Sequence, residues 1–192
     1  MNQSKLVFID VETTGLSPQK GHRIIEIGAV AIENNCVIDE FQSLIKINRS
    51  IPRHVSKIHG ITNEMLTNQP GPENVFPNVR SFIAGSVLIA HNAEFDMAFL
   101  RSEFHKLNLT VDNRFLCTLK ICRKRYPNLP NHKLDTIYRH LIRTNGDMLQ
   151  IGGHVTAARR DRNVSPEVRS FGSGRKHEIL RPQERGQATG RM

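Results

Sequence analysis

Residues 6–15 read Leu6-Val7-Phe8-Ile9-Asp10-Val11-Glu12-Thr13-Thr14-Gly15, and they form the first hydrophobic segment of the chain. An apolar run of this length that ends in a glycine turn predicts a buried strand. Side chains alternate along a strand, so Asp10 and Glu12 point to the same face. Acids are costly to bury unpaired, whereas hard divalent cations bind through carboxylate oxygens. The segment therefore predicts a cation site, and a solvated strand end is the alternative.

Composition limits the class of protein. The chain has 192 residues, a length that favours one domain, alone or with a tail. Its formal charge of +9 favours a polyanionic partner such as nucleic acid. The simpler alternative is a basic, solvated surface with no such partner. Cys36, Cys117 and Cys122 are too few and too scattered for a disulfide framework or a zinc site. No apolar stretch approaches 18 residues, and the short polar N-terminus leaves no room for a signal peptide. We expect a cytoplasmic protein with no membrane association.

The order of predicted elements indicates an α/β domain built on a mixed sheet. A strand in the segment 6–15 and strands at 23–32 and 37–47 predict an antiparallel meander, because only a short Glu-Asn-Asn break separates the last two. Two short helices are expected next, at 52–58 and from Thr62, and then a helix at 75–84 with Pro77 in its first turn and Gly85 as its C-cap. Residues 87–90 are expected to form a buried parallel strand. The last expected elements are helices at 93–107, 115–126 and 132–142. Three antiparallel strands followed by parallel strands and flanking helices are the expected fold.

Composition changes after residue 142. Ten of the 27 lysines and arginines lie in residues 143–192, and nine of these ten are arginine. Aliphatic residues become sparse there, so the segment has too little apolar area to offset chain entropy. We expect a domain at 1–158 and a basic, poorly ordered tail at 159–192.

Three acids are expected to meet at one end of the sheet. Asp10 and Glu12 end the first strand, and Asp96 lies in the first turn of the helix that follows the strand at 87–90. If the two strands are neighbours, the carboxylates converge and can hold two metal ions about 4 Å apart for in-line attack on phosphate. A first-turn acid stabilised by the helix dipole is the simpler alternative for Asp96.

The same residues resemble the motifs of a known family, the DEDD 3′–5′ exonucleases. The matching segments, in chain order, are Phe8-Ile9-Asp10-Val11-Glu12-Thr13-Thr14-Gly15-Leu16, Ile24-Ile25-Glu26-Ile27-Gly28-Ala29, His59-Gly60-Ile61-Thr62, His91-Asn92-Ala93-Glu94-Phe95-Asp96 and Pro130-Asn131-His132-Lys133-Leu134-Asp135. The resemblance covers residues 4–142. It is strongest to the subgroup of the proofreading epsilon subunit of bacterial DNA polymerase III, called DnaQ-like or DEDDh.

This resemblance implies a ribonuclease-H-like fold and removal of nucleotides from the 3′ end of DNA with two Mg²⁺ or Mn²⁺ ions. It implies that Asp10, Glu12 and Asp96 are metal ligands. The substrate-binding residues that it implies are Glu12, Thr13, His59 and Asn92. The implied partners are a single-stranded or frayed 3′ end and a polymerase catalytic subunit.

The last motif of the family departs from its pattern here. The family has a histidine, the general base, and an aspartate five residues later. The best candidate histidine is His154, but Arg159 stands five residues later, and Asp161 stands seven residues later. An arginine in place of the acid would repel cations. Either His154 and Asp161 are displaced remnants, or the gene is frameshifted or recombined near codon 142, and another reading frame would then encode the missing motif.

Three functions therefore stay open. The leading one is a metal-dependent exonuclease on DNA, weakened by the atypical last motif, since loss of a general base costs about 10²–10⁴ in rate. The second is an RNA-trimming exonuclease of the same superfamily. The third is a non-catalytic subunit that binds nucleic acid or a polymerase, with a basic tail that contacts phosphates.

Overall fold

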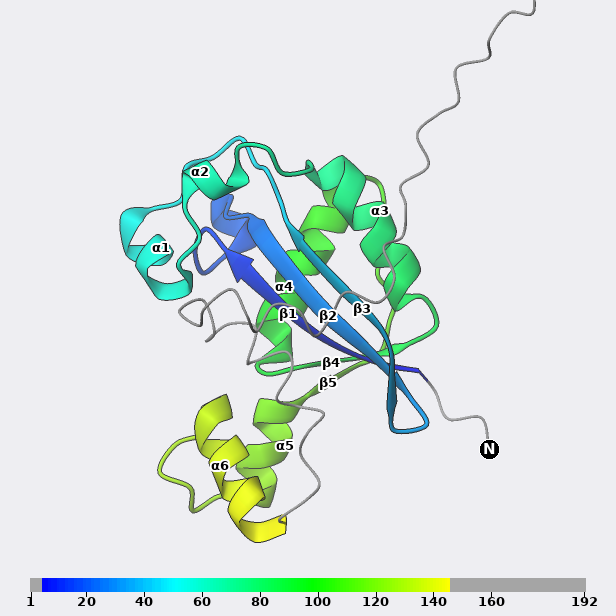
Figure 1. The fold of residues 1–192 in the computed structure, drawn as a ribbon, viewed down its shortest axis with the longest axis vertical. Helices are drawn as coiled ribbons and strands as arrows, with labels where there is room; N and C mark the ends of the chain where they lie inside the picture. Colours follow the sequence, from blue (N-terminus) through cyan, green and yellow to red (C-terminus); the bar gives the residue numbers. More distant parts are fainter. Residues whose placement is uncertain (1–4, 146–192) are drawn as a thin grey trace, which may run out of the picture. The chain divides into compact units, whose positions relative to one another are not determined.

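The computed structural model of the protein describes residues 5–145 (Figure 1). Within these residues a sheet has the strand order β3-β2-β1-β4-β5. The strands are β1 (Leu6–Thr13), β2 (Ile24–Glu33), β3 (Cys36–Leu44), β4 (Val87–Ala90) and β5 (Phe115–Cys117). β1 therefore lies in the middle of the sheet, with neighbours on both sides.

The first three strands form the expected antiparallel meander. β1 pairs antiparallel with β2, and β2 pairs antiparallel with β3. The β2–β3 turn consists of Asn34 and Asn35, both with positive φ, at 51° and 61°. This geometry suits a two-residue hairpin, and asparagine tolerates it. β4 pairs parallel with β1 and with β5, so the predicted mixed sheet is confirmed.

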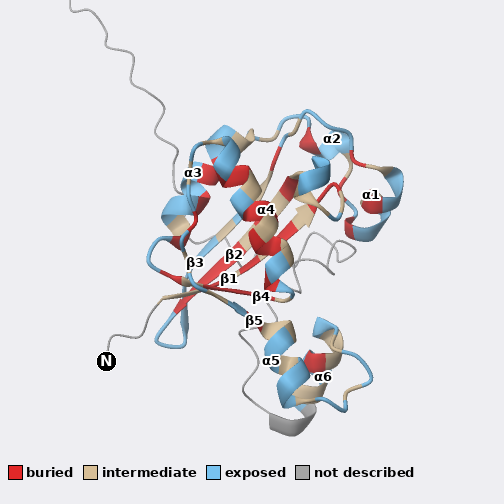
Figure 2. Cartoon of the chain, turned by 180° about the vertical axis from the view of Figure 1, so that it is seen from behind, coloured by how far each residue is buried: buried red, intermediate tan, exposed pale blue. Residues whose placement is uncertain are grey.

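The helices flank the sheet, and two of them cover one of its faces. Their bounds are η1 (Pro18–Lys20, a 3-10 turn), α1 (Arg53–His59), α2 (Asn63–Leu66), α3 (Pro72–Ile83), α4 (Ala93–Lys106), α5 (Thr118–Arg125) and α6 (Leu134–Asn145). α3 and α4 lie behind the sheet in Figure 1 and in front of it in the reversed view of Figure 2. Buried residues follow β1, β2 and the sheet-facing side of α4, whereas the hairpin end of β3 is exposed (Figure 2).

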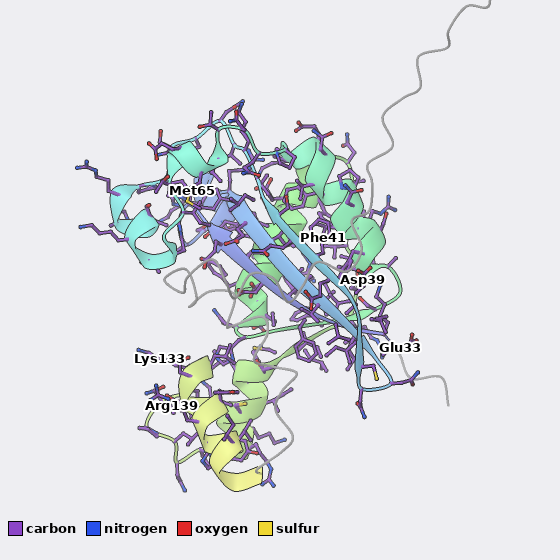
Figure 3. All side chains as sticks on the ribbon, in the orientation of Figure 1. Glu33, Asp39, Phe41, Met65, Lys133 and Arg139 are labelled. Atoms are coloured by element: carbon purple, nitrogen blue, oxygen red, sulfur yellow. The ribbon has the colours of Figure 1, made fainter. Side chains whose placement is uncertain are left out.

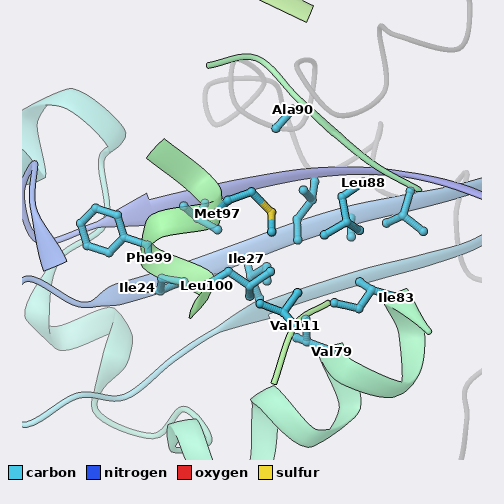
Figure 4. Close-up of a cluster of buried hydrophobic side chains, with 14 of the residues drawn as sticks. Ile24, Ile27, Val79, Ile83, Leu88, Ala90, Met97, Phe99, Leu100 and Val111 are labelled. Carbon is cyan, nitrogen blue, oxygen red and sulfur yellow. The ribbon is translucent and has the colours of Figure 1, made fainter. Parts of the chain in front are cut away.

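The main core fills the space between this face of the sheet and α3 and α4. Met97, Phe99 and Leu100 of α4 pack with side chains of the sheet and of α3 (Figure 4). A second, smaller cluster holds α1 and α2 against the start of β2; its members are Ile25, Ile51, Val55, Ile61 and Leu66. The opposite face of the sheet carries the acids of β1.

Three sequence expectations need correction. Residues 115–117 form a strand, β5, and not the first turn of a helix, because they extend the sheet beside β4. α3 begins at Pro72, so Pro77 lies inside the helix and not in its first turn. Ala84 is the C-cap of α3, and Gly85 follows with φ 69°.

Other expectations concern residues that lie outside the described part. The domain limit at 158 and the basic tail at 159–192 stay predictions. Within residues 5–145, no helix combines the length and the apolar character that crossing a bilayer requires.

Candidate active site at the end of β1

The acids of β1 lie on the face of the sheet opposite α3 and α4. Val7, Ile9 and Val11 point into the core and are at most 4% exposed. The alternation of side chains places Asp10 and Glu12 on the other face, where both are half-buried. Asp10 stands opposite Gly28 of β2, and a Cβ built on Gly28 would meet no atom of the described residues within 4 Å. Among the described residues, the sheet therefore leaves space at Gly28, on the face that carries Asp10.

Asp96 approaches β1 where β4 stops. The paired residues of the two strands run from Leu6 with Val87 to Phe8 with Ile89, so the second half of β1 continues past the end of β4. α4 begins just beyond that end, and its first turn brings Asp96 to the free edge of β1. There the backbone N–H of Val11, between the two acids of β1, donates to Asp96 Oδ1 at 3.2 Å.

The Asp96 carboxylate is strongly desolvated. It is 4% exposed, and burial raises its pKa from 3.8 to about 7, with a further contribution from the nearby charge of Glu12. Two hydrogen bonds from backbone N–H groups, those of Val11 and Asp96 itself, act in the opposite direction. Burial of an acid without a cationic partner is unfavourable, and a bound cation would relieve it.

The three acids do not form a compact group of ligands as the side chains stand. In the part of the chain that the structure describes, no three His, Cys, Asp or Glu side chains gather closely enough to hold a metal ion. The structure brings together Asp96 and the backbone between Asp10 and Glu12, and it places Glu12 within electrostatic reach of Asp96. The assignment of the three acids as ligands stays a proposal.

The turn after β1 is held by its own hydroxyl groups. Thr13 is buried, and its Oγ1 donates to the carbonyl of Gly15 at 2.6 Å. Gly15 packs so closely on His22 that a Cβ would lie 2.4 Å from the ring. Leu16 follows with 87% of its surface exposed. The turn is therefore rigid at Thr13 and presents an apolar side chain to solvent.

His59 ends α1 and is 9% exposed. Its Nδ1 accepts from the backbone N–H of Ile61 at 3.0 Å, so the neutral ring carries its proton on Nε2. Gly60 makes the bend possible with φ 76°. The second core cluster fixes this corner, so His59 has a defined position, and its contact with a nucleotide stays a proposal.

Asn92 has a backbone role that the sequence does not reveal. It adopts the left-handed conformation, with φ 71° and ψ 48°, at the start of α4. Its carbonyl accepts from the N–H of Phe95 at 2.9 Å, and its side chain caps no helix N–H. Asparagine is one of the few residues that tolerate this geometry, so the residue type is explained without a ligand.

The residue before it, His91, has long-range contacts that sequence reasoning missed. Its Nε2 donates to the carbonyl of His132 at 2.9 Å, and its Nδ1 lies 3.0 Å from Thr118 Oγ1. Burial is the main cause that lowers the pKa of His91, and the charge of Arg123 lowers it further. His91 thus joins the end of β4 to α5 and to the segment before α6. The sequence signals were its place at a strand end and within a segment that matches the family, and neither indicates these contacts.

The predicted general base, His154, and the displaced acid, Asp161, lie outside the described residues. The three acids, Thr13, His59 and Asn92 all lie within them.

The comparisons with known proteins agree with the fold and the motifs. A family model described as "Exonuclease" (RNase_T) matches residues 7–147. The PolC-type DNA polymerase III of Caldanaerobacter subterraneus is 42% identical over 70% of this chain and 10% of its own length. The 3′–5′ exonuclease DinG of Bacillus subtilis is 38% identical over 73% of this chain and 15% of its own. The DNA polymerase III subunit epsilon of Buchnera aphidicola is 37% identical over 68% of this chain and 59% of its own.

A solved structure of exonuclease X with 5′ overhanging duplex DNA has 26% identity and a TM-score of 0.58, and it covers 76% of this chain and 75% of that one. The predicted ribonuclease-H-like fold and the resemblance to DnaQ-like proofreading exonucleases are confirmed. The chain spans at most about three fifths of the length of these three curated relatives. From the match over residues 7–147, this chain belongs to the exonuclease family that the RNase_T model describes.

Proposed function

We propose that the protein is a 3′–5′ exonuclease that hydrolyses nucleotides from the 3′ end of DNA with two Mg²⁺ or Mn²⁺ ions. The observation that carries this proposal is the buried Asp96 carboxylate at the free edge of β1, bonded to the backbone between Asp10 and Glu12. The family is metal-dependent. Relatives with 3′–5′ exonuclease and DNA polymerase names, and a neighbour with bound DNA, support the reaction and the substrate.

The residues at the end of β1 fit a hard cation. Asp10, Glu12 and Asp96 offer only carboxylate oxygens, which are the ligands that Mg²⁺ prefers. A bound cation would offset the desolvation of Asp96 and its repulsion from Glu12. When bound, such ions neutralise the charge that develops on the leaving oxygen of a phosphodiester. In this proposal the three acids around the end of β1 would supply carboxylates to the two ions that the family resemblance implies.

The surrounding residues would bind the last nucleotide. Glu12 would contact the terminal 3′-hydroxyl, and the Thr13 turn would lie beside the sugar. Leu16, exposed at the end of that turn, offers an apolar surface for a base. His59 and Asn92 would border the same nucleotide, and His154 would accept the proton of the attacking water.

Basic residues on α5 and α6 supply charge for the phosphate backbone. The last turn of α5 carries Arg123, Lys124 and Arg125. Lys133 and Arg139 lie at α6, whereas the acidic Glu33 and Asp39 lie at the distant β2–β3 hairpin (Figure 3). These cations would attract the phosphate backbone of a DNA strand toward the end of the molecule that carries α5 and α6.

A second function is favoured by one specific observation. The family match ends at residue 147, before His154, and Arg159 stands where the family has its last acid. A protein that keeps the fold but lacks this motif would bind a DNA end, or a polymerase subunit, without cutting efficiently.

One assay separates these functions. DNA with a 3′-mismatched end, and an RNA of the same length, would each be labelled at the 5′ end and incubated with Mg²⁺ or Mn²⁺. The exonuclease proposal predicts a ladder shortened from the 3′ end, lost in Asp10→Ala and kept in Asp39→Ala, which removes an exposed acid of β3. Degradation of RNA alone would favour the RNA-trimming function. Retained DNA binding without degradation would favour the non-catalytic one.

A further inference from the structure

Glu103 is a buried acid in α4 that the proposed reaction does not use. It is 1% exposed and stands among the apolar residues Phe99, Leu100 and Phe104. Both of its oxygens are engaged by one guanidinium: Arg23 Nε lies 2.6 Å from Oε1, and Arg23 Nη2 lies 2.7 Å from Oε2. A two-pronged pair of this kind, here called the clamp, fixes the orientation of both side chains.

The clamp connects α4 to the turn that follows β1. The backbone N–H of Arg23 donates to Thr14 Oγ1 at 3.0 Å, and the N–H of Thr14 donates to the Arg23 carbonyl at 3.0 Å. Thr14 lies directly between Thr13 and Gly15, which form the proposed nucleotide-binding turn. Movement of Glu103 would therefore be transmitted to this turn through Arg23.

The same helix holds the proposed metal ligand. Asp96 and Glu103 are seven residues apart, which is two helical turns or about 10 Å, so they face the sheet on one side of α4. Each accepts from a backbone N–H of the sheet: Asp96 from Val11 at 3.2 Å, and Glu103 from Ile24 at 3.4 Å. The helix is thus attached to β1 at one point and to β2 at another.

We propose that Arg23 and Glu103 are positioning residues that set the place of Asp96 relative to Asp10 and Glu12. The inference rests on the proposed cation site. The contacts link β1 to α4 at two places. At one, Thr14 after β1 bonds to Arg23, which holds Glu103 of α4. At the other, Asp96 of α4 accepts from Val11 of β1. Without the clamp, only the apolar packing of α4 sets its position along the sheet, and we expect the carboxylate separation to be less closely fixed.

Stability alone is a weak reason for this pair. Glu103 is buried and the Arg23 side chain is 25% exposed. An ion pair that is largely buried is often no more stabilising than apolar residues of similar volume, and the neighbouring positions of α4 are already apolar. What the pair adds is a fixed position of α4 along the sheet at the level of Glu103.

The test compares variants that weaken the clamp with one that destabilises the core elsewhere. Glu103→Gln removes the charge and keeps the shape, and Arg23→Lys keeps the charge and removes the two-pronged contact. Ile83→Ala, in α3, is the matched control because Ile83 is 1% exposed in the main core and its side chain has no polar atom that could join the clamp. Arg23→Lys replaces Glu103→Gln in the comparison if the latter fails to fold.

The first measurement, amide hydrogen exchange of the metal-free protein, depends on no metal or activity. The reference is the Leu88 N–H of β4, which donates at 2.9 Å to the carbonyl of Arg114, the residue before β5. The measured quantity is the exchange rate of the Val11 N–H divided by that of the Leu88 N–H. We expect this ratio to rise by at least about tenfold in the clamp variants. In Ile83→Ala we expect it to stay at its wild-type value. Equal acceleration of both amides in all variants would overturn the proposal.

The second measurement is Mn²⁺ affinity, which we expect to fall by about tenfold or more in the clamp variants and to stay near wild type in Ile83→Ala. An unchanged affinity in Glu103→Gln and Arg23→Lys would contradict the positioning role. If the wild-type protein itself binds no Mn²⁺, the proposed cation site fails, and the exchange ratio still decides whether the clamp holds Asp96 on β1.

Discussion

Replacement of Asp96 by asparagine should stabilise the metal-free protein, although it removes a proposed ligand. Burial raises the pKa of Asp96 from 3.8 to about 7. At about 1.4 kcal/mol per pKa unit, this shift costs about 4 kcal/mol of folding free energy once the pH exceeds 7. The introduced amide would carry no charge and could still accept from the Val11 N–H, so Asp96→Asn should raise the free energy of unfolding by about 2–4 kcal/mol at pH 8.

The sign of the pH dependence follows from the raised pKa. An acid whose pKa is higher in the folded state favours folding below its unfolded pKa, and that contribution is lost as the pH rises toward the folded value. In a chelating buffer, the stability gap between Asp96→Asn and wild type should grow from near zero at pH 4 to its full value above pH 7. Urea denaturation at pH 4, 6 and 8 measures the gap. A variant no more stable than wild type at pH 8 would refute the claim that the cost of burying the Asp96 carboxylate exceeds the gain from its hydrogen bonds.

Three further substitutions test the local geometry. His91→Gln should remove part of the acid sensitivity of the fold, because the lowered pKa of His91 means that stability is lost as the pH falls below about 6.5. Denaturation at pH 7.5 and 5.5 measures the loss of unfolding free energy in wild type and in the variant. Equal losses in the two proteins would count against this role of His91. Gly15→Ala should destabilise the protein by about 1–3 kcal/mol, because the alanine methyl group would meet the His22 ring. Adding His22→Ala to the same chain should restore most of the lost melting temperature. A double variant that melts no higher than Gly15→Ala would point to another cause. Asn92→Val should lower the stability of the protein by about 1–2 kcal/mol, because residue 92 adopts the left-handed conformation. Asn92→Gly should be close to neutral in the same thermal melts. Equal effects of the two substitutions would argue against backbone strain at this position.

Local patterns predicted most of the fold. The alternation of β1 placed its acids on one face, and the helical spacing of Phe95, Phe99 and Phe104 identified α4. The Asn34–Asn35 pair marked the hairpin. These features depend on neighbours in the sequence, so they are visible without the structure.

The failures have a different physical origin. β5 is three residues long and runs directly into α5, so no local period separates the two. Glu103 is bonded to Arg23, 80 residues earlier, and His91 to a carbonyl 41 residues later. An acid among apolar helix positions was the only local sign of the first contact, and its partner could not be predicted from spacing. The role of His154 stays a prediction.

The measurement that tests the central claim most directly is Mn²⁺ binding to the full chain by isothermal titration, with Asp10→Ala and Asp96→Asn as variants. We expect that wild type binds Mn²⁺, that both substitutions weaken binding by about tenfold or more, and that Asp39→Ala leaves it unchanged. Wild-type affinity in both site variants, or no binding by the folded wild-type protein, would contradict a cation site at the end of β1.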